Sequence, residues 1–251
     1  MRCPKKMRRI AGYLLLGTTA LVMAAPVWTK PYMEWSKKDA LRILQNSPWT
    51  ARYELRRYRG RTALPSEEVS RGEFRTPDYR APGENVFQDT YWAWLFSAAP
   101  VRQAYARLIA LENGYDRMSP PEQAVLERQL APLVEARFPE HIVVAFDYGS
   151  NDRDLLQAVQ SFLRTATVAQ FLDRAYLLTP RAGRLSPLDY QPPTADGTGA
   201  KFIFPRYVDG EPVVTAEDKE LAFELTVPVT EEKLYLRWKI KDLVVGGELL
   251  L

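Results

Sequence analysis

The stretch that decides the fold class is KLYLRWKIK, residues 233–241. Its odd-numbered positions carry lysine, tyrosine or arginine, and its even-numbered positions carry leucine, tryptophan or isoleucine. A period of two places the apolar side chains on one face of a β-strand and the charged side chains on the other. The sequence therefore predicts a strand over residues 233–243 that is half-buried.

The same period extends towards the N-terminus as far as about residue 168. Three further segments read as strands, 171–179, 201–206 and 221–227. Asp209-Gly210 and Gly246-Gly247 are sequences typical of tight turns between paired strands. We expect residues 168–251 to form an antiparallel, β-rich, sandwich-like unit, with the proline- and glycine-rich stretch 180–199 inside it.

Upstream of residue 168 the apolar residues follow the helical period of 3.6. Short strands are interleaved with these helices at 49–59, 90–96 and 142–146. Helix-start signals, which satisfy the first free N–H groups of a helix, occur near Ser36, Pro100, Ser119 and Asn151 or Asp152. We expect residues 36–166 to form an α/β part in which helices pack on a mixed sheet, so that the fold class is α+β.

The N-terminus has the features of a secretory signal. Residues 1–12 contain five basic residues and no acidic one, and residues 13–25 are uncharged and largely apolar. We expect a signal peptide over residues 1–24, cleaved after Ala24, and then a linker over 25–35. The predicted location is the periplasm or the medium. The alternative is an uncleaved inner-membrane anchor over residues 10–28, which are uncharged throughout.

Composition excludes several classes of protein. The whole chain carries a net charge of +3, and removal of the five basic residues in 1–24 leaves −2, so we expect no nucleic-acid partner. The chain has one His and one Cys. A zinc site built from several such ligands and a disulfide framework are therefore both excluded.

Two groups of residues are candidates for binding. Arginines interleave with tyrosines after Trp49, and the candidates among them are Arg56, Arg57 and Arg59. Outside the cytosol such a cluster would bind acidic glycans or anionic lipid headgroups. The alternative, which we favour, is a solvated strand edge whose positive charge discourages aggregation with other sheets. Trp92 and Trp94 share a strand face and suit the stacking of sugar rings, but their apolar surroundings favour the core.

Residues 147–154, DYGSNDRD, form the densest run of oxygen ligands. Asp147, Asp152 and Asp154 are the candidate ligands for a hard cation such as Ca²⁺, and no other cofactor is expected. The alternative, which we favour, is that these residues cap the helix that follows.

No catalytic residue can be assigned. His141 is the only histidine, and the G-x-S-x-G motif of serine hydrolases is absent. We interpret His141 as a strand-edge residue beside Glu140. Acidic residues elsewhere lie in turn-like segments, so no pair of carboxylates for glycoside hydrolysis stands out.

Short blocks resemble a group of exported bacterial proteins of unknown function that are loosely associated with the GWxTD domain. These blocks are KPYMEW (30–35), NSPW (46–49), GAKFIFPR (199–206) and the ending 236–251. The motif that names that domain is absent from this chain. The resemblance implies an exported protein and carries over no functional residue.

Together these patterns predict a non-enzymatic cell-envelope or secreted protein that binds an envelope protein or a glycan. Recognition surfaces are expected in the long aperiodic segment 60–88 and in the β-rich unit. The alternative is a hydrolase that acts on envelope polysaccharide or peptide, with carboxylates that the sequence does not pair.

Overall fold

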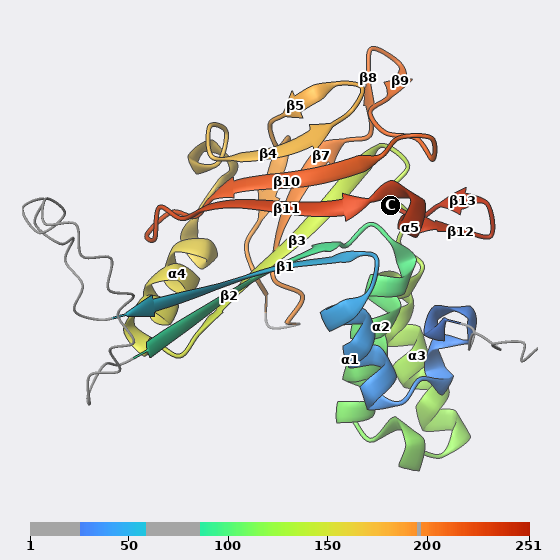
Figure 1. Cartoon of the computed structure of the whole chain (residues 1–251). Coiled ribbons are helices and arrows are strands. Elements are labelled where there is room, and N and C mark those ends of the chain that lie inside the picture. Colours follow the sequence, from blue (N-terminus) through green and yellow to red (C-terminus); the bar gives the residue numbers. More distant parts are fainter. Residues whose placement is uncertain (1–25, 59–85, 195–196) are drawn as a thin grey trace, which may run out of the picture.

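The computed structural model describes residues 26–58, 86–194 and 197–251 (Figure 1). The predicted signal peptide, Arg59 and most of the segment 60–88 lie outside the described residues. In the part of the chain that is described, no helix combines the length and the apolar character needed to cross a membrane.

The larger of two main sheets is antiparallel throughout. Its five strands lie in the order β1 (Thr50–Tyr58), β2 (Val86–Leu95), β3 (His141–Ser150), β7 (Ala200–Pro205) and β6 (Asp189–Gln191). The expectation of a mixed sheet is therefore wrong. The reason is that α2 (Ala99–Glu112) and α3 (Pro120–Val134) form a helical hairpin at the end of the sheet where β2 stops (Figure 1). The chain thus re-enters the sheet as β3 from that same end and runs antiparallel to β2.

The smaller sheet is formed by the C-terminal region, as its period of two predicts. Its order is β11 (Lys233–Lys239), β10 (Glu220–Thr226), β4 (Ala175–Thr179) and β5 (Gly183–Leu185), again antiparallel. Two tight hairpins are appended, β8–β9 (Tyr207–Val208 and Glu211–Pro212) and β12–β13 (Val244–Val245 and Glu248–Leu249). Strands β6 and β7 leave this region and join the larger sheet, so the regions before and after residue 168 share one sheet.

Some strand ends differ from the sequence prediction. The predicted strand 171–179 starts only at Ala175, and the predicted strand 233–243 stops at Lys239, where the short helix α5 (Ile240–Leu243) begins. Short 3-10 turns occupy Val27–Thr29, Tyr32–Glu34, Tyr115–Arg117 and Val168–Gln170.

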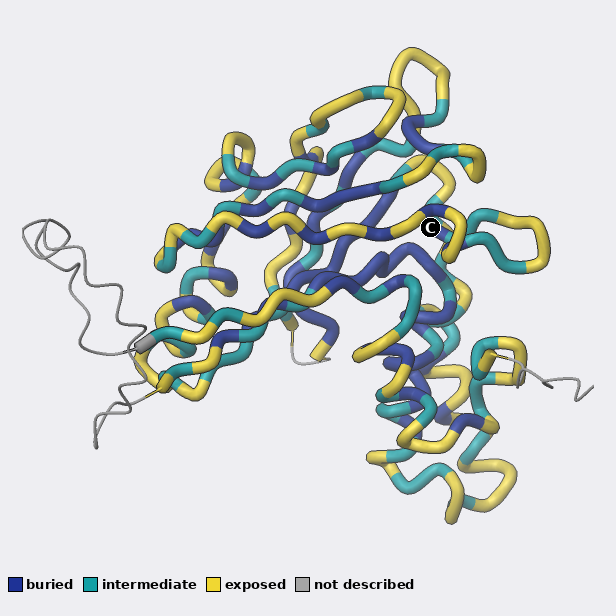
Figure 2. The backbone as a smooth tube through the Cα atoms, viewed as in Figure 1, coloured by how far each residue is buried: buried dark blue, intermediate teal, exposed yellow. Residues whose placement is uncertain are grey.

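The core lies between the two sheets. The ring of Phe202 on β7 lies 5.2 Å from that of Phe223 on β10 and 4.9 Å from that of Phe171, measured between centroids. Helix α4 (Arg153–Thr165) packs beside this core. The hydroxyl of Tyr190, on β6, donates to the Leu163 carbonyl of α4 at 2.6 Å. Figure 2 shows buried positions along strands of both sheets.

The opposite face of the larger sheet is covered at one end by α1 (Lys37–Asn46) and α2. Trp94 Nε1 donates to the Leu44 carbonyl at 2.7 Å, and the Trp94 ring meets the Tyr105 ring edge to face at 6.1 Å. At this end, β2, which contains most of the predicted strand 90–96, is therefore covered on both faces.

The helix boundaries follow local chemistry. Ser36 and Asp39 form a capping box, as do Ser119 and Glu122, and Asp152 caps α4. These caps satisfy backbone N–H groups that have no partner within the helix.

Candidate functional site

Arg57 does not present a free charge, because it is paired with a carboxylate that the sequence reading missed. Arg57 donates from Nε and Nη2 to the two oxygens of Asp89, which is fully buried. Asp89 also accepts from the Tyr148 hydroxyl at 2.8 Å and the Ser150 hydroxyl at 2.6 Å. Burial raises the pKa of Asp89, but the hydrogen bonds from Arg57, Ser150 and Tyr148 outweigh it, and the net shift is downward.

The three candidate metal ligands do not converge. Asp152 accepts from the Leu155 N–H and lies 3.4 Å from Arg57 Nη2, so it caps α4 and joins the Arg57 network. Asp147 lies on the other face of β3, and Asp154 is exposed in the first turn of α4. Residues 26–58, 86–194 and 197–251 contain no group of three or more His, Cys, Asp or Glu that could hold a metal ion.

Arg52 on β1, Trp92 on β2 and Asp147 on β3 lie side by side in one row across the larger sheet. Arg52 pairs with Trp92 in the β1–β2 register, and Trp92 pairs with Asp147 in the β2–β3 register. The Arg52 guanidinium carbon lies 5.0 Å from the Trp92 ring, and that ring stacks on Trp94 with centroids 5.9 Å apart. Burial raises the pKa of Asp147. Trp94 is buried in the core and Trp92 is half-buried against it, so the two rings serve mainly as packing.

A polar surface is formed by the face of the smaller sheet that points away from the core. We call it the outer face. Strand register places nine polar or aromatic side chains on it, those of Tyr176, Arg184, Glu220, Glu224, Thr226, Lys233, Tyr235, Arg237 and Lys239. Figure 2 shows the alternation of buried and exposed positions along β11 that produces this face.

Positive charge exceeds negative charge on the outer face. Glu224 is shared by Arg184 (2.7 Å) and Lys233 (3.2 Å), and Glu220 lies 3.6 Å from Arg237. Lys239 has no ion-pair partner in the part of the chain that the structure describes. Four basic side chains therefore face two carboxylates. The alternation in the sequence predicted the polar side of β11, but it did not predict that Glu220 and Glu224 of β10 lie opposite that strand.

The tyrosines of the outer face lie among these cations. Half of the Tyr235 side chain is exposed, and the Arg237 guanidinium carbon lies 5.6 Å from its ring. The Arg184 guanidinium carbon lies 3.5 Å from the Tyr176 ring. Tyr176 is half-buried, so the exposed ring of Tyr235 beside Arg237 is the stacking surface that this pair of tyrosines offers.

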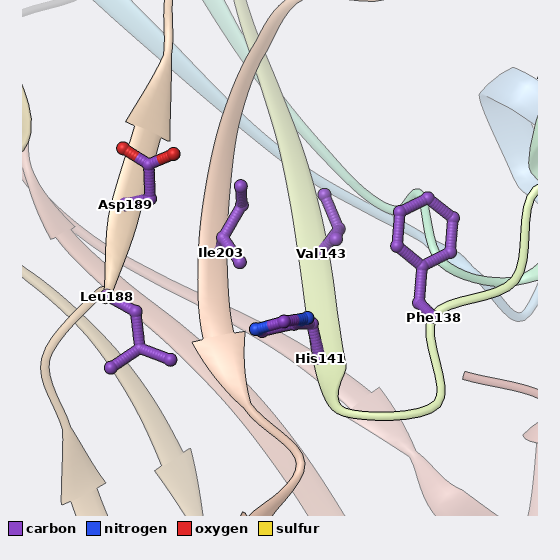
Figure 3. Close-up of a pocket in the computed structure, with 6 residues that line it drawn as sticks. All are labelled: Phe138, His141, Val143, Leu188, Asp189 and Ile203. Atoms are coloured by element: carbon purple, nitrogen blue, oxygen red, sulfur yellow. The ribbon is translucent and has the colours of Figure 1, made fainter.

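His141 lines a pocket of about 240 Å³ on the larger sheet, near the edge formed by β7 and β6 (Figure 3). The other lining residues are Phe138, Val143, Leu188, Asp189 and Ile203. The Asp189 carboxylate points away from the imidazole in Figure 3. The lining is mostly apolar and includes one carboxylate and neither serine nor cysteine among the described residues.

Comparison with known proteins adds no assignment to these surfaces. No protein-family model matches this chain, and neither a curated protein nor a solved structure matches it.

Proposed function

We propose that this protein is an exported binding protein that recognises an anionic polysaccharide of the cell envelope through the outer face. The observation that carries the proposal is the arrangement of β11, where Lys233, Tyr235, Arg237 and Lys239 alternate with buried residues and point to solvent. A strand with this pattern presents charge and an aromatic ring on one rigid surface.

The dimensions of the outer face favour a polymer over a small ion. Seven residues of extended chain span about 20 Å, so the cations from Lys233 to Lys239 form a track rather than a point. The excess of positive over negative side chains on this face supports an anionic partner, although the chain without residues 1–24 carries a net charge of −2.

The chemistry of the outer face favours an acidic glycan over a lipid surface. Tyr235 offers a ring and a hydroxyl, which suit a sugar that carries both apolar C–H faces and hydroxyl groups. A membrane-binding face combines cations with several apolar side chains that enter the lipid. On the outer face, the neighbours of Tyr235 along β11 are the charged residues Lys233 and Arg237.

Export is part of the proposal and rests on residues 1–24, which have a basic start, an apolar run and small residues at the exit. The protein then works in the periplasm or outside the cell, where acidic polysaccharides occur. An uncleaved segment 10–28 would keep the same face outside the cytoplasm.

The experiment is calorimetric titration of the purified protein with polygalacturonate, and with dextran as an uncharged polysaccharide. We expect binding to polygalacturonate only, with an affinity that falls as salt is raised, because exposed charges are screened. Equal binding of both polymers, or of neither, would contradict the proposal. Binding to anionic vesicles but not to polygalacturonate would replace the glycan with a lipid, and release of reducing ends would support the hydrolase alternative.

A further inference from the structure

A second pocket, of about 400 Å³, lies where the start of α2 meets the segment 136–139 and the C-terminal residues 248–251. It does not involve the outer face. Three arginines line it, Arg102, Arg137 and Arg206. Its volume lies within the range of about 300–1,000 Å³ that is typical of small-molecule sites.

Arg102 places a buried positive charge in the wall of this pocket. Its side chain is almost fully buried, at 4% exposure. Burial lowers its pKa to about 10. Its guanidinium donates only to main-chain oxygens, those of Phe96, Ser97, Leu133 and Ala136. These carbonyls fix the group in place, but they do not neutralise its charge as a carboxylate would.

Arg206 is held in the same way and keeps one nitrogen free. Its Nε donates to the Phe138 carbonyl at 3.1 Å, and its Nη2 donates to oxygens of His141 and Leu251 at 3.2 and 3.0 Å. Its Nη1 has no hydrogen-bond partner among the described residues, and this nitrogen is not fully buried. The two N–H groups of Nη1 therefore have no acceptor among the described residues, and Arg206 is one of the residues that line the pocket.

The charges of the pocket are not balanced from within. Arg137 is exposed and has no ion pair among the described residues. Glu248 is the carboxylate side chain in the lining, and none of the ion pairs among the described residues joins it to the three arginines. The negative charge of Glu140, which lies outside the lining, acts on Arg206, whereas Arg102 and Arg137 have no carboxylate partner among the described residues. A concave site with fixed, desolvated cations concentrates anions.

We propose that this pocket binds a small molecule that carries a carboxylate or phosphate group on an apolar body. A guanidinium with a fixed fork of donors matches the geometry of either oxyanion. The side chains of Phe138, Leu249 and Leu250 supply the apolar part of the wall. The Arg102 guanidinium carbon lies 5.2 Å from the Phe138 ring, so charge and apolar surface meet in one place.

The test is a set of NMR titrations of the purified protein with benzoate, phenyl phosphate and the uncharged benzamide, all at one ionic strength. We expect at least one of the two anions to shift resonances of the pocket residues and benzamide to bind much more weakly. Binding of benzoate alone identifies a carboxylate ligand, and binding of phenyl phosphate alone identifies a phosphate ligand. Binding of neither anion, or of benzamide equally well, would overturn the proposal.

Two variants of exposed residues test the charge argument without disturbing the fold. R137Q is expected to weaken anion binding about tenfold, the equivalent of about 1.4 kcal/mol. E248Q removes a repulsive carboxylate and is expected to tighten binding about threefold. R42Q, on the exposed side of α1, is the matched control and should bind as the unaltered protein does. Absence of either predicted shift would overturn the proposal.

Discussion

Arg57 and Asp89 form a two-point ion pair between the neighbouring strands β1 and β2, with Arg57 Nη2 3.1 Å from Asp89 Oδ1. The carboxylate is fully buried, whereas a third of the arginine side chain is exposed. The same carboxylate accepts from Tyr148 and Ser150 of β3, so it ties three strands together.

Asp89→Asn is expected to lower the free energy of unfolding by about 3 kcal/mol, because it leaves the partly buried Arg57 charge with only the longer contact to Asp152, at 3.4 Å. Urea denaturation of the two proteins measures this difference. Asp154→Asn, at an exposed site in the first turn of α4, is the control and should change stability by less than about 0.5 kcal/mol. A similar small change for Asp89→Asn would show that the pair does not stabilise the sheet.

The contribution of Asp89 should disappear in acid. The folded protein holds the pKa of Asp89 below its usual value. Its stabilisation is therefore fully present above the unfolded pKa of about 3.9 and is lost as the pH falls through the lower, folded pKa. The stability difference between the unaltered protein and Asp89→Asn should accordingly shrink below about pH 4. A difference that stays constant from pH 7 to pH 3 would contradict this assignment.

Asp147 should behave in the opposite way. Burial raises its pKa, and its carboxylate accepts only from the Tyr148 N–H, at 2.9 Å. The unfolded chain thus ionises first as the pH rises, and the folded state carries a penalty from about pH 4 up to neutrality. Asp147→Asn keeps the acceptor and removes the charge, so it should add about 0.5–1 kcal/mol of stability at pH 7. Thermal melts at pH 7 and pH 3 should show the gain only at pH 7, and a loss at pH 7 would indicate a role for the carboxylate.

Gly199 and Gly210 offer a matched pair of substitutions. Both have a positive φ, +75° and +82°. A Cβ at Gly199 would lie 2.5 Å from the Phe146 carbonyl oxygen, whereas a Cβ at Gly210 would meet nothing within 4 Å. Gly210→Ala should cost about 1–2 kcal/mol of backbone strain. Gly199→Ala should cost a further ~2 kcal/mol from the clash, because backbone must move. Equal losses in chemical denaturation would show that β7 can shift away from β3.

Local features of this fold could be predicted from the sequence because they depend on neighbouring residues. The alternation in 233–239, the capping residues Ser36 and Ser119, and the turns at Asp209-Gly210 and Gly246-Gly247 all occur where they are expected. The left-handed Gly114 that follows α2 likewise agrees with its Asn-Gly sequence.

Long-range pairing could not be predicted in this way. The pairing of β7 with β3 joins residues about 60 positions apart, and no periodicity specifies it. The partner of Arg57 was missed for the same reason, since Asp89 lies on another strand, 32 positions away, between the polar residues Gln88 and Thr90. Conversely, the aspartates of 147–154 are close in sequence but do not converge, because Asp147 lies on β3 whereas Asp152 and Asp154 lie at the start of α4.

The most direct test of the central proposal is the affinity for polygalacturonate of a variant that carries Lys233→Gln, Arg237→Gln and Lys239→Gln. The matched control replaces three exposed cations of α1, Lys37, Lys38 and Arg42, by glutamine. If the outer face is the binding site, the first variant should bind at least about tenfold more weakly than the control, a difference of about 1.4 kcal/mol. Equal affinities of the two variants would show that polygalacturonate responds to overall charge, and the outer face would then not be the site.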